Sequence, residues 1–224
     1  MEKMLKYFEP KTRLISITKP VIEDLETAEE LIAFTARVSN PGNQLNNETA
    51  HKLLRYCIKH AHWSIFEMVD ATIEIECPRD IGRQILRHRT FTFQEFSQRY
   101  AEAEEYTWRE PRLQDEKNRQ NSLEGVDKDT RDAWQLIQTN ALIQAKKDYK
   151  WALGMGIAKE VARTILPEGL TMSRMYMKGS LRSWIHYCDL RSGHGTQKEH
   201  MLIAQDCWKL IANKFPSVVQ AVKE

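Results

Sequence analysis

The sequence predicts an α+β fold in a single domain, with a small antiparallel or mixed sheet and several helices. Three observations support this prediction. Strand-like segments are few and lie early in the chain, helix-like segments dominate the later part, and no alternation of strand, helix and strand is visible. The length of 224 residues fits one domain covering residues 1–224, and such a chain can bury a core without disulfide bonds.

The composition is that of a globular protein, with 42% hydrophobic and 29% charged residues. Lys and Arg number 33 against 31 Asp and Glu, and this net charge of +2 argues against a general nucleic-acid coat. No stretch approaches the ~18 apolar residues of a membrane helix. The N-terminus lacks a signal-peptide pattern. None of the four cysteines lies in a C-x-x-C pair, which argues against a zinc ribbon or a thioredoxin-type motif. Free thiols without an export signal indicate a cytoplasmic protein.

The first half of the chain contains the predicted strands. Leu14 to Thr18 reads as a short strand, and a capping box at Thr27 opens a helix that ends near Pro41. A second helix starts around Asn47. From Met68 to Cys77, apolar and polar residues alternate, which predicts a strand with one buried and one solvated face. A short helix is expected directly after it.

The second half is predicted to be helical after a polar excursion or lid at about residues 101–126. Helices are expected from Asp129 to Lys150, from Ile157 to Leu166, and from Ser180 to about Leu190. A last helix carries apolar residues from Met201 to Phe215. The first of these helices is expected to carry one apolar face, which consists of Trp134, Ile137, Ala141 and Ala145.

Charge is concentrated between Arg79 and Tyr100. Five arginines face two acids there, so the segment carries 5 − 2 = +3, more than the whole chain. Guanidinium groups suit phosphate, and Ser97 with backbone N–H groups could complete a phosphate cradle. Two alternatives stay open: a basic helix end beside an edge strand, or a nucleic-acid groove. In the second, the phenylalanines at 91, 93 and 96 would stack on bases.

Two further segments carry polar side chains at close spacing. His60, His62 and Glu67 could bind a metal in a hydrolase, or the histidines could simply end a helix. Arg182 and His186 are four residues apart and share one helix face, as in many amphipathic helices. The cysteines fit apolar faces, and no nucleophile elbow or P-loop occurs. The residues alone therefore indicate an anion-binding arginine cluster and no particular reaction.

The segment from Arg87 to Tyr100 resembles the signature of the flavin-dependent thymidylate synthases, RHRxxSxNxxSxRY. Thr92 and Gln94 stand for its first Ser and its Asn, and the outright matches are Arg87, His88, Arg89, Ser97, Arg99 and Tyr100. Further segments look like the family's other landmarks, in the family's order, across about residues 14–205. They are Ala36–Ser39, His60–Glu67, Glu160–Arg163, Leu166–Pro167 and Leu190–Arg191.

This resemblance implies an enzyme that methylates dUMP to dTMP. Methylenetetrahydrofolate would supply the carbon, FAD would mediate the redox chemistry, and NADPH would reduce the flavin. The resemblance implies no cysteine nucleophile and no metal ion. It also implies a homotetramer whose active sites are built from several subunits.

The resemblance assigns roles residue by residue. Arg191 would be catalytic, beside the uracil, where a fixed cation stabilises developing charge. Arg163 would reach in from a neighbouring subunit, and Ser97 and Arg99 would hold the phosphate. The full dUMP set is Gln84, Arg87, Glu95, Ser97, Arg99, Arg163 and Arg191. The FAD set is Ser39, His62, Ser64, Glu67, Arg87, His88, Arg89, Thr90, Gln94, Glu95, Ser180, Arg182 and His186.

Overall fold

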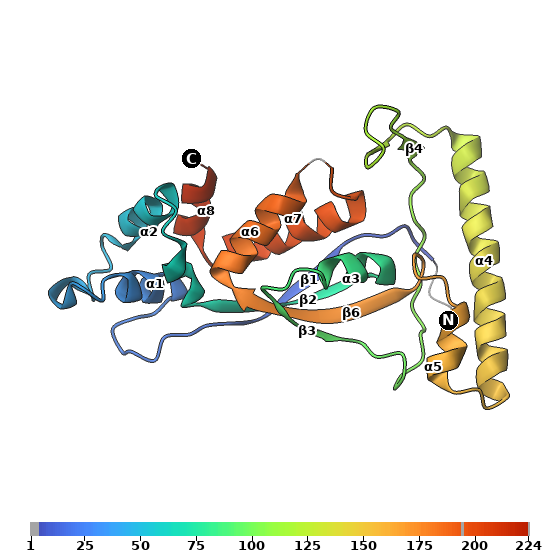
Figure 1. The fold of residues 1–224 in the computed structure, drawn as a ribbon, viewed down its shortest axis with the longest axis horizontal. Helices are drawn as coiled ribbons and strands as arrows, with labels where there is room; N and C mark the ends of the chain where they lie inside the picture. Colours follow the sequence, from blue (N-terminus) through green and yellow to red (C-terminus); the bar gives the residue numbers. More distant parts are fainter. Residues whose placement is uncertain (1–4, 194, 224) are drawn as a thin grey trace.

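A four-stranded antiparallel sheet forms the centre of the protein (Figure 1). The computed structural model describes residues 5–193 and 195–223. The strand order is β1-β2-β6-β3, so the two central strands are far apart in sequence. The strands are β1 (Lys11–Ile17), β2 (Asp70–Pro78), β6 (Met172–Ser180) and β3 (Thr92–Glu95). The predicted α+β class is confirmed, and the sheet is antiparallel.

Strand β6 is a central element that the sequence prediction missed. It pairs with β2 along its whole length, with Ile73 opposite Met177 and Ile75 opposite Met175. Its inward side chains Met175 and Met177 are fully buried while Tyr176 between them is exposed. Methionine and glycine are not strand-favouring residues, and they conceal this alternation in the sequence.

Position 179 in β6 must be glycine because the Phe91 ring lies directly against its backbone. A Cβ atom placed there would lie 2.5 Å from Cδ1 of Phe91. The Phe91 ring packs edge-on against Trp184, with centroids 4.8 Å apart, and Trp184 donates from Nε1 to the Ala71 carbonyl at 3.1 Å. This aromatic contact joins β2, β6 and α6 (Leu181–Ser192) in the main core.

Helices cover one side of the sheet and one of its ends (Figure 1). The helices α3 (Arg79–Ile85), α6 and α7 (Lys198–Ala212) lie along the sheet. The helices α1 (Ala28–Ala36), α2 (Ala50–Lys59) and α8 (Pro216–Lys223) gather at one end, with the short 3₁₀ segments η1 (Pro41–Asn43) and η2 (Trp63–Glu67). The predicted capping box is confirmed, because Thr27 accepts from the Glu30 N–H and Glu30 accepts from the Thr27 N–H.

The long helix α4 (Lys128–Gly154) stands at the opposite end of the molecule (Figure 1). The predicted apolar face of this helix is largely exposed. Trp134, Ile137 and Ala141 are exposed, and Ala145 is half-buried. The residues that α4 buries are instead Gln138, Leu142, Tyr149 and Ala152. Near its C-terminal end, Tyr149 and Ala152 form a small second core with Ala103, Ala162 and Leu166.

Two other helix predictions needed correction. The segment predicted as a helix from Ile157 to Leu166 contains one helical turn, α5 (Lys159–Ala162), followed by a 3₁₀ turn, η3 (Arg163–Ile165). Its apolar residues stay largely exposed, so no packing extends the helix. The last predicted helix is α7, which ends at Ala212 and so does not reach Phe215. The helix α8, which was not predicted, begins at Pro216, a residue that the first helical position favours.

The polar excursion at residues 101–126 contains a two-stranded hairpin of β4 (Leu113–Gln114) and β5 (Ser122–Leu123). It is anchored to the domain by Arg109 and Arg112, which both form ion pairs with the buried Glu199 of α7. Within the described ranges, the structure contains no helix of the length and apolar character that a membrane span requires.

Candidate functional site

The predicted site residues fall into three groups along the molecule. The α3–α6 corner contains Gln84, Arg87, His88, Arg89 and Arg191. The η2 group contains His62, Ser64, Glu67, Arg182 and His186. The α5 group contains Ser97, Arg99 and Arg163. Figure 1 places α2 and α5 at opposite ends of the sheet, so the η2 and α5 groups are separated within one chain.

Arg191 and His88 form the centre of the α3–α6 corner. The Arg191 Nε donates to His88 Nε2 at 3.0 Å, so this ring nitrogen is unprotonated. Burial, followed by the positive charges of Arg191 and Arg87, lowers the pKa of His88. A neutral imidazole therefore holds the Arg191 guanidinium. Helix α6 positions Arg191 in its last turn.

Arg87 and Arg89 lie on the same corner and differ from the arginines before them. Both are exposed, and within the described part of the chain neither guanidinium has a hydrogen-bond or ion-pair partner. Arg79 and Arg83, by contrast, contact the carboxylates of Glu95 and Glu168 at 3.3 to 3.9 Å. The corner therefore offers two uncompensated guanidinium groups to an anionic ligand.

Glu95 ends β3 and is half-buried. Its Oε1 accepts from the Ser173 hydroxyl at 2.9 Å, and Arg79 and Arg83 lie 3.9 Å from its carboxylate. Gly82 in α3 lies against this carboxylate, since a Cβ there would sit 3.9 Å from its Oε1. Glu95 is thus held between α3, β3 and β6.

The η2 group combines an ion pair with stacked rings. Arg182 contacts Glu67 at 3.1 Å, and the His186 ring packs edge-on against Trp63 with centroids 4.7 Å apart. His62 and Ser64 are exposed beside them. The described residues contain no group of three His, Cys, Asp or Glu side chains arranged for a metal ion. The hydrolase alternative therefore has no three-ligand site in this part of the chain.

The α5 group lies where the chain leaves β3. Ser97 Oγ accepts from the Arg99 backbone N–H at 3.3 Å, and Arg99 pairs with Glu160 at 3.1 Å. Arg163 follows one turn after Glu160 and donates to its carbonyl. Arg99 and Glu160 are largely exposed, so a phosphate can compete for this arginine.

The remaining predicted residues lie around these groups. Ser39 is exposed in the turn after α1, and Thr90 and Gln94 are exposed on either side of the start of β3. Ser180 is buried, and its hydroxyl caps α6 by accepting from the Ser183 N–H at 3.3 Å. The roles assigned to these four residues, like those of the other predicted site residues, stay predictions.

The three phenylalanines of the arginine-rich segment lie in β3 or directly beside it. Phe91 is buried against Trp184, and Phe93 and Phe96 are half-buried. Their rings are therefore not displayed for stacking on bases, which removes the main support for a nucleic-acid groove.

All four cysteines are buried and free. Burial raises the pKa of each thiol, in the case of Cys77 to about 12. A thiolate is the reactive form, so these side chains are inert as nucleophiles near neutral pH.

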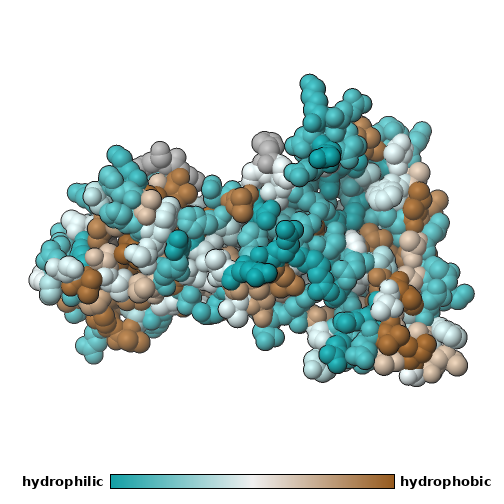
Figure 2. Space-filling model, in the orientation of Figure 1, coloured by the Kyte–Doolittle hydropathy of each residue, from teal (hydrophilic) through white to brown (hydrophobic). Residues whose placement is uncertain are grey.

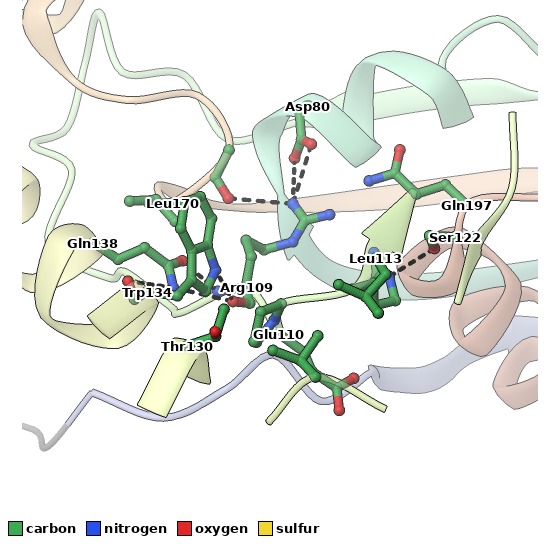
Figure 3. Close-up of a pocket in the computed structure, with 14 residues that line it drawn as sticks. Asp80, Arg109, Glu110, Leu113, Ser122, Thr130, Trp134, Gln138, Leu170 and Gln197 are labelled. Carbon is green, nitrogen blue, oxygen red and sulfur yellow. Dashed lines mark hydrogen bonds and ion pairs between the residues drawn. The ribbon is translucent and has the colours of Figure 1, made fainter. Parts of the chain in front are cut away.

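A cavity of about 610 Å³ lies between the excursion, α3 and α4 (Figure 3). Arg109 crosses it, donating to Asp80 at 2.9 Å and to the Gly169 carbonyl at 3.2 Å, while Trp134 and Gln138 donate to the Arg109 carbonyl. Gln197 lies on its wall (Figure 3). The sequence predicted only a polar excursion or lid in this region and no cavity. The signal available was two arginines at 109 and 112, but their partner Glu199 is too distant in sequence to be inferred.

The fold and the site together define an α+β protein with a half-buried His–Arg pair beside free guanidinium groups. The sequence matches the family described as "Thymidylate synthase complementing protein" over residues 20–217. A "Probable flavin-dependent thymidylate synthase" of Paramecium bursaria Chlorella virus 1 is 52% identical over 94% of this chain and 97% of its own. The "Flavin-dependent thymidylate synthase" of Synechocystis sp. is 50% identical, over 94% and 98%.

A solved structure shares this fold. The UMP/dUMP methylase PolB from Streptomyces cacaoi, bound with 5-Br dUMP, superposes with a TM-score of 0.84 at 24% identity, covering 98% of this chain and 97% of its own. The chain belongs to the family of flavin-dependent thymidylate synthases, and the resemblance seen in its signature is confirmed.

Proposed function

We propose that the protein converts dUMP to dTMP with bound FAD, taking the carbon from methylenetetrahydrofolate and reducing equivalents from NADPH. The observation that carries the proposal is the α3–α6 corner. There, the family signature places two uncompensated guanidinium groups, Arg87 and Arg89, beside the His88–Arg191 pair. Relatives that are half identical over nearly the whole chain are named for this activity.

The residues present fit a flavin dinucleotide. Arg87 and Arg89 supply charge for a pyrophosphate, and the η2 group supplies exposed polar groups and ring faces for the rest of the molecule. When bound, FAD supplies the redox and carbon-transfer chemistry. Arg182 and His186 share one face of α6 and would hold the same cofactor.

The dUMP site would use residues of the other two groups. Ser97 and Arg99 would bind the phosphate, with Arg163 supplied by a neighbouring subunit. Gln84, Arg87 and Glu95 would complete the pocket, and Arg191 would stabilise negative charge on the uracil ring. The hydrogen bond from Arg191 to His88 supports this role, because it fixes the guanidinium before the substrate arrives.

No cysteine is expected to attack the uracil. All four thiols are buried, and their raised pKa values keep them protonated. The chemistry would therefore depend on the cofactor and on positioned charge.

The exposed apolar face of α4 supports assembly into a homotetramer. Ile143 and Trp151 are 61% and 64% exposed, and Leu136, Ile137 and Met155 are exposed to a similar extent. Brown patches mark this end of the molecule in Figure 2. A second copy is the partner we propose, because the α5 and η2 groups lie at opposite ends of one chain and need another subunit to meet.

A visible absorption spectrum tests the cofactor assignment. The purified protein, loaded with FAD and freed of excess, should retain about one FAD per chain, and NADPH should bleach it under argon. A folded protein that retains no flavin, even with dUMP present, would contradict the proposal.

A further inference from the structure

A series of hydrogen bonds connects the excursion to Gln84, and it begins at the buried carboxylate of Glu199. Arg112 donates to both carboxylate oxygens of Glu199 at 2.8 and 3.0 Å, and Arg109 lies 2.8 Å from Oε2. Burial raises the pKa of Glu199, but the hydrogen bonds from Arg112 and Arg109 outweigh it and lower the pKa to about 2. The carboxylate is therefore ionised and can only accept hydrogen bonds.

This charge fixes the direction of the next two links. Gln197 must turn its Nε2 toward Glu199, at 3.2 Å, which leaves its Oε1 facing Gln84. Gln84 donates from Nε2 to that oxygen at 2.7 Å. The Oε1 of Gln84 then faces His200 Nδ1 at 3.4 Å. A flipped Gln84 amide would place two carbonyl oxygens against each other, so the ionised carboxylate selects one orientation.

His200 is the last residue but one in this series of hydrogen bonds, which ends at the Tyr187 hydroxyl. It is fully buried in α7, and its Nδ1 must carry the proton, because it faces the Gln84 carbonyl oxygen. Its Nε2 accepts from the Tyr187 hydroxyl at 3.2 Å. Burial, then the charges of Arg191 and His88, lowers the pKa of His200 to about 3, so the ring is neutral. The Tyr187 ring packs edge-on against His88, with centroids 4.9 Å apart.

We propose that His200 and Gln197 are positioning residues that hold the Gln84 amide in one orientation toward dUMP. This inference rests on the proposed function, which places Gln84 in the dUMP site. One N–H of Gln84 has no partner among residues 5–193 and 195–223, and it is the group offered to an oxygen of the substrate. Neither His200 nor Gln197 lies in the segments that carry the family resemblance.

The test compares three variants of the FAD-loaded enzyme with wild type, by steady-state kinetics and by calorimetric titration with dUMP. His200→Leu removes both ring nitrogens. His200→Asn keeps a donor near the position of Nδ1. Gln197→Met removes the link on the other side of Gln84 and lies at a half-buried position, so it serves if His200→Leu does not fold.

His200→Leu and Gln197→Met are expected to raise the KM and Kd for dUMP about tenfold, with kcat changed less than about threefold. His200→Asn should return both to within about threefold of wild type. FAD content should stay the same in all variants. An unchanged KM in both disruptive variants, or no rescue by His200→Asn, would overturn the inference. Wild-type enzyme that binds no dUMP would instead overturn the proposed function and this inference with it.

Discussion

Four arginines between residues 79 and 89 share one short segment but have different surroundings. Arg79 and Arg83 contact carboxylates of the same chain, including that of Glu95. Arg87 and Arg89 are exposed, and the described residues offer them no acidic partner. The net charge of the segment indicates an anion site, but only the fold separates the arginines that hold the structure from those left for a ligand. Two of the four predictions that follow test this separation directly, and the other two test the corner as a whole and the thiols.

The largest effect on turnover is expected from Arg191 in the α3–α6 corner. Arg191→Lys should lower kcat on the order of 10²–10³-fold while FAD stays bound, because an ammonium cannot reproduce the guanidinium fork held by His88. Steady-state assays and flavin content measure both parts. Arg83→Lys is the matched control, since it keeps a charge that is paired with the carboxylates of Glu95 and Glu168. Near-normal turnover of Arg191→Lys would show that its side chain does not stabilise the transition state.

Removing an uncompensated guanidinium should weaken cofactor binding. Arg87→Ala and Arg89→Ala are each expected to raise the Kd for FAD roughly 10- to 100-fold, the equivalent of one charge-assisted hydrogen bond. Arg83→Ala, from the paired set, should stay within about threefold of wild type. Titration of the apoprotein with FAD, followed by fluorescence, gives the three values. An equal loss of FAD affinity in all three variants would show that the exposed arginines do not differ from the paired ones in binding the cofactor.

Removing a paired arginine should affect stability instead. Arg79 is buried and contacts Glu95 and Glu168, so Arg79→Ala should lower the free energy of unfolding by about 2 kcal/mol. Arg83, which is half exposed, should contribute less than about 1 kcal/mol when replaced by Ala. Denaturant unfolding of the FAD-free protein measures both. A stable Arg79→Ala variant that lost only FAD would place Arg79 in the binding set.

The smallest effect on chemistry is expected from the thiols. Replacing Cys57, Cys77, Cys188 and Cys207 together by Ala or Ser should leave dTMP formation in place, since all four are buried and protonated. The folded variant is compared with wild type at equal FAD content. A flavin-bound, folded variant without activity would assign a chemical role to a cysteine.

The sequence predicted the elements whose local pattern agrees with their environment. The alternation in β2 and the capping box at Thr27 were sufficient to predict a strand and a helix start. β6 was missed because its buried positions carry methionine and glycine. The apolar stripe of α4 did not indicate which residues the helix buries, because its exposed apolar residues outnumber its buried ones. An apolar stripe ordinarily marks the face that packs on the core.

The same limit applies to the site. The signature and its neighbours supplied the candidate residues, because their spacing is local. The contacts that orient them span long separations: Arg191 with His88, Arg112 with Glu199, and His200 with Gln84. Such pairs form only when the sheet brings α3, α6 and α7 together, and no single-sequence pattern encodes them.

Product formation by the purified protein is the most direct test of the account. FAD-loaded protein is incubated with dUMP, methylenetetrahydrofolate and NADPH under argon, and dTMP is quantified by chromatography, with FAD-free protein as the control. The account predicts dTMP from the FAD-loaded protein and none without the cofactor. A folded, FAD-loaded protein that binds dUMP but forms no dTMP would contradict it.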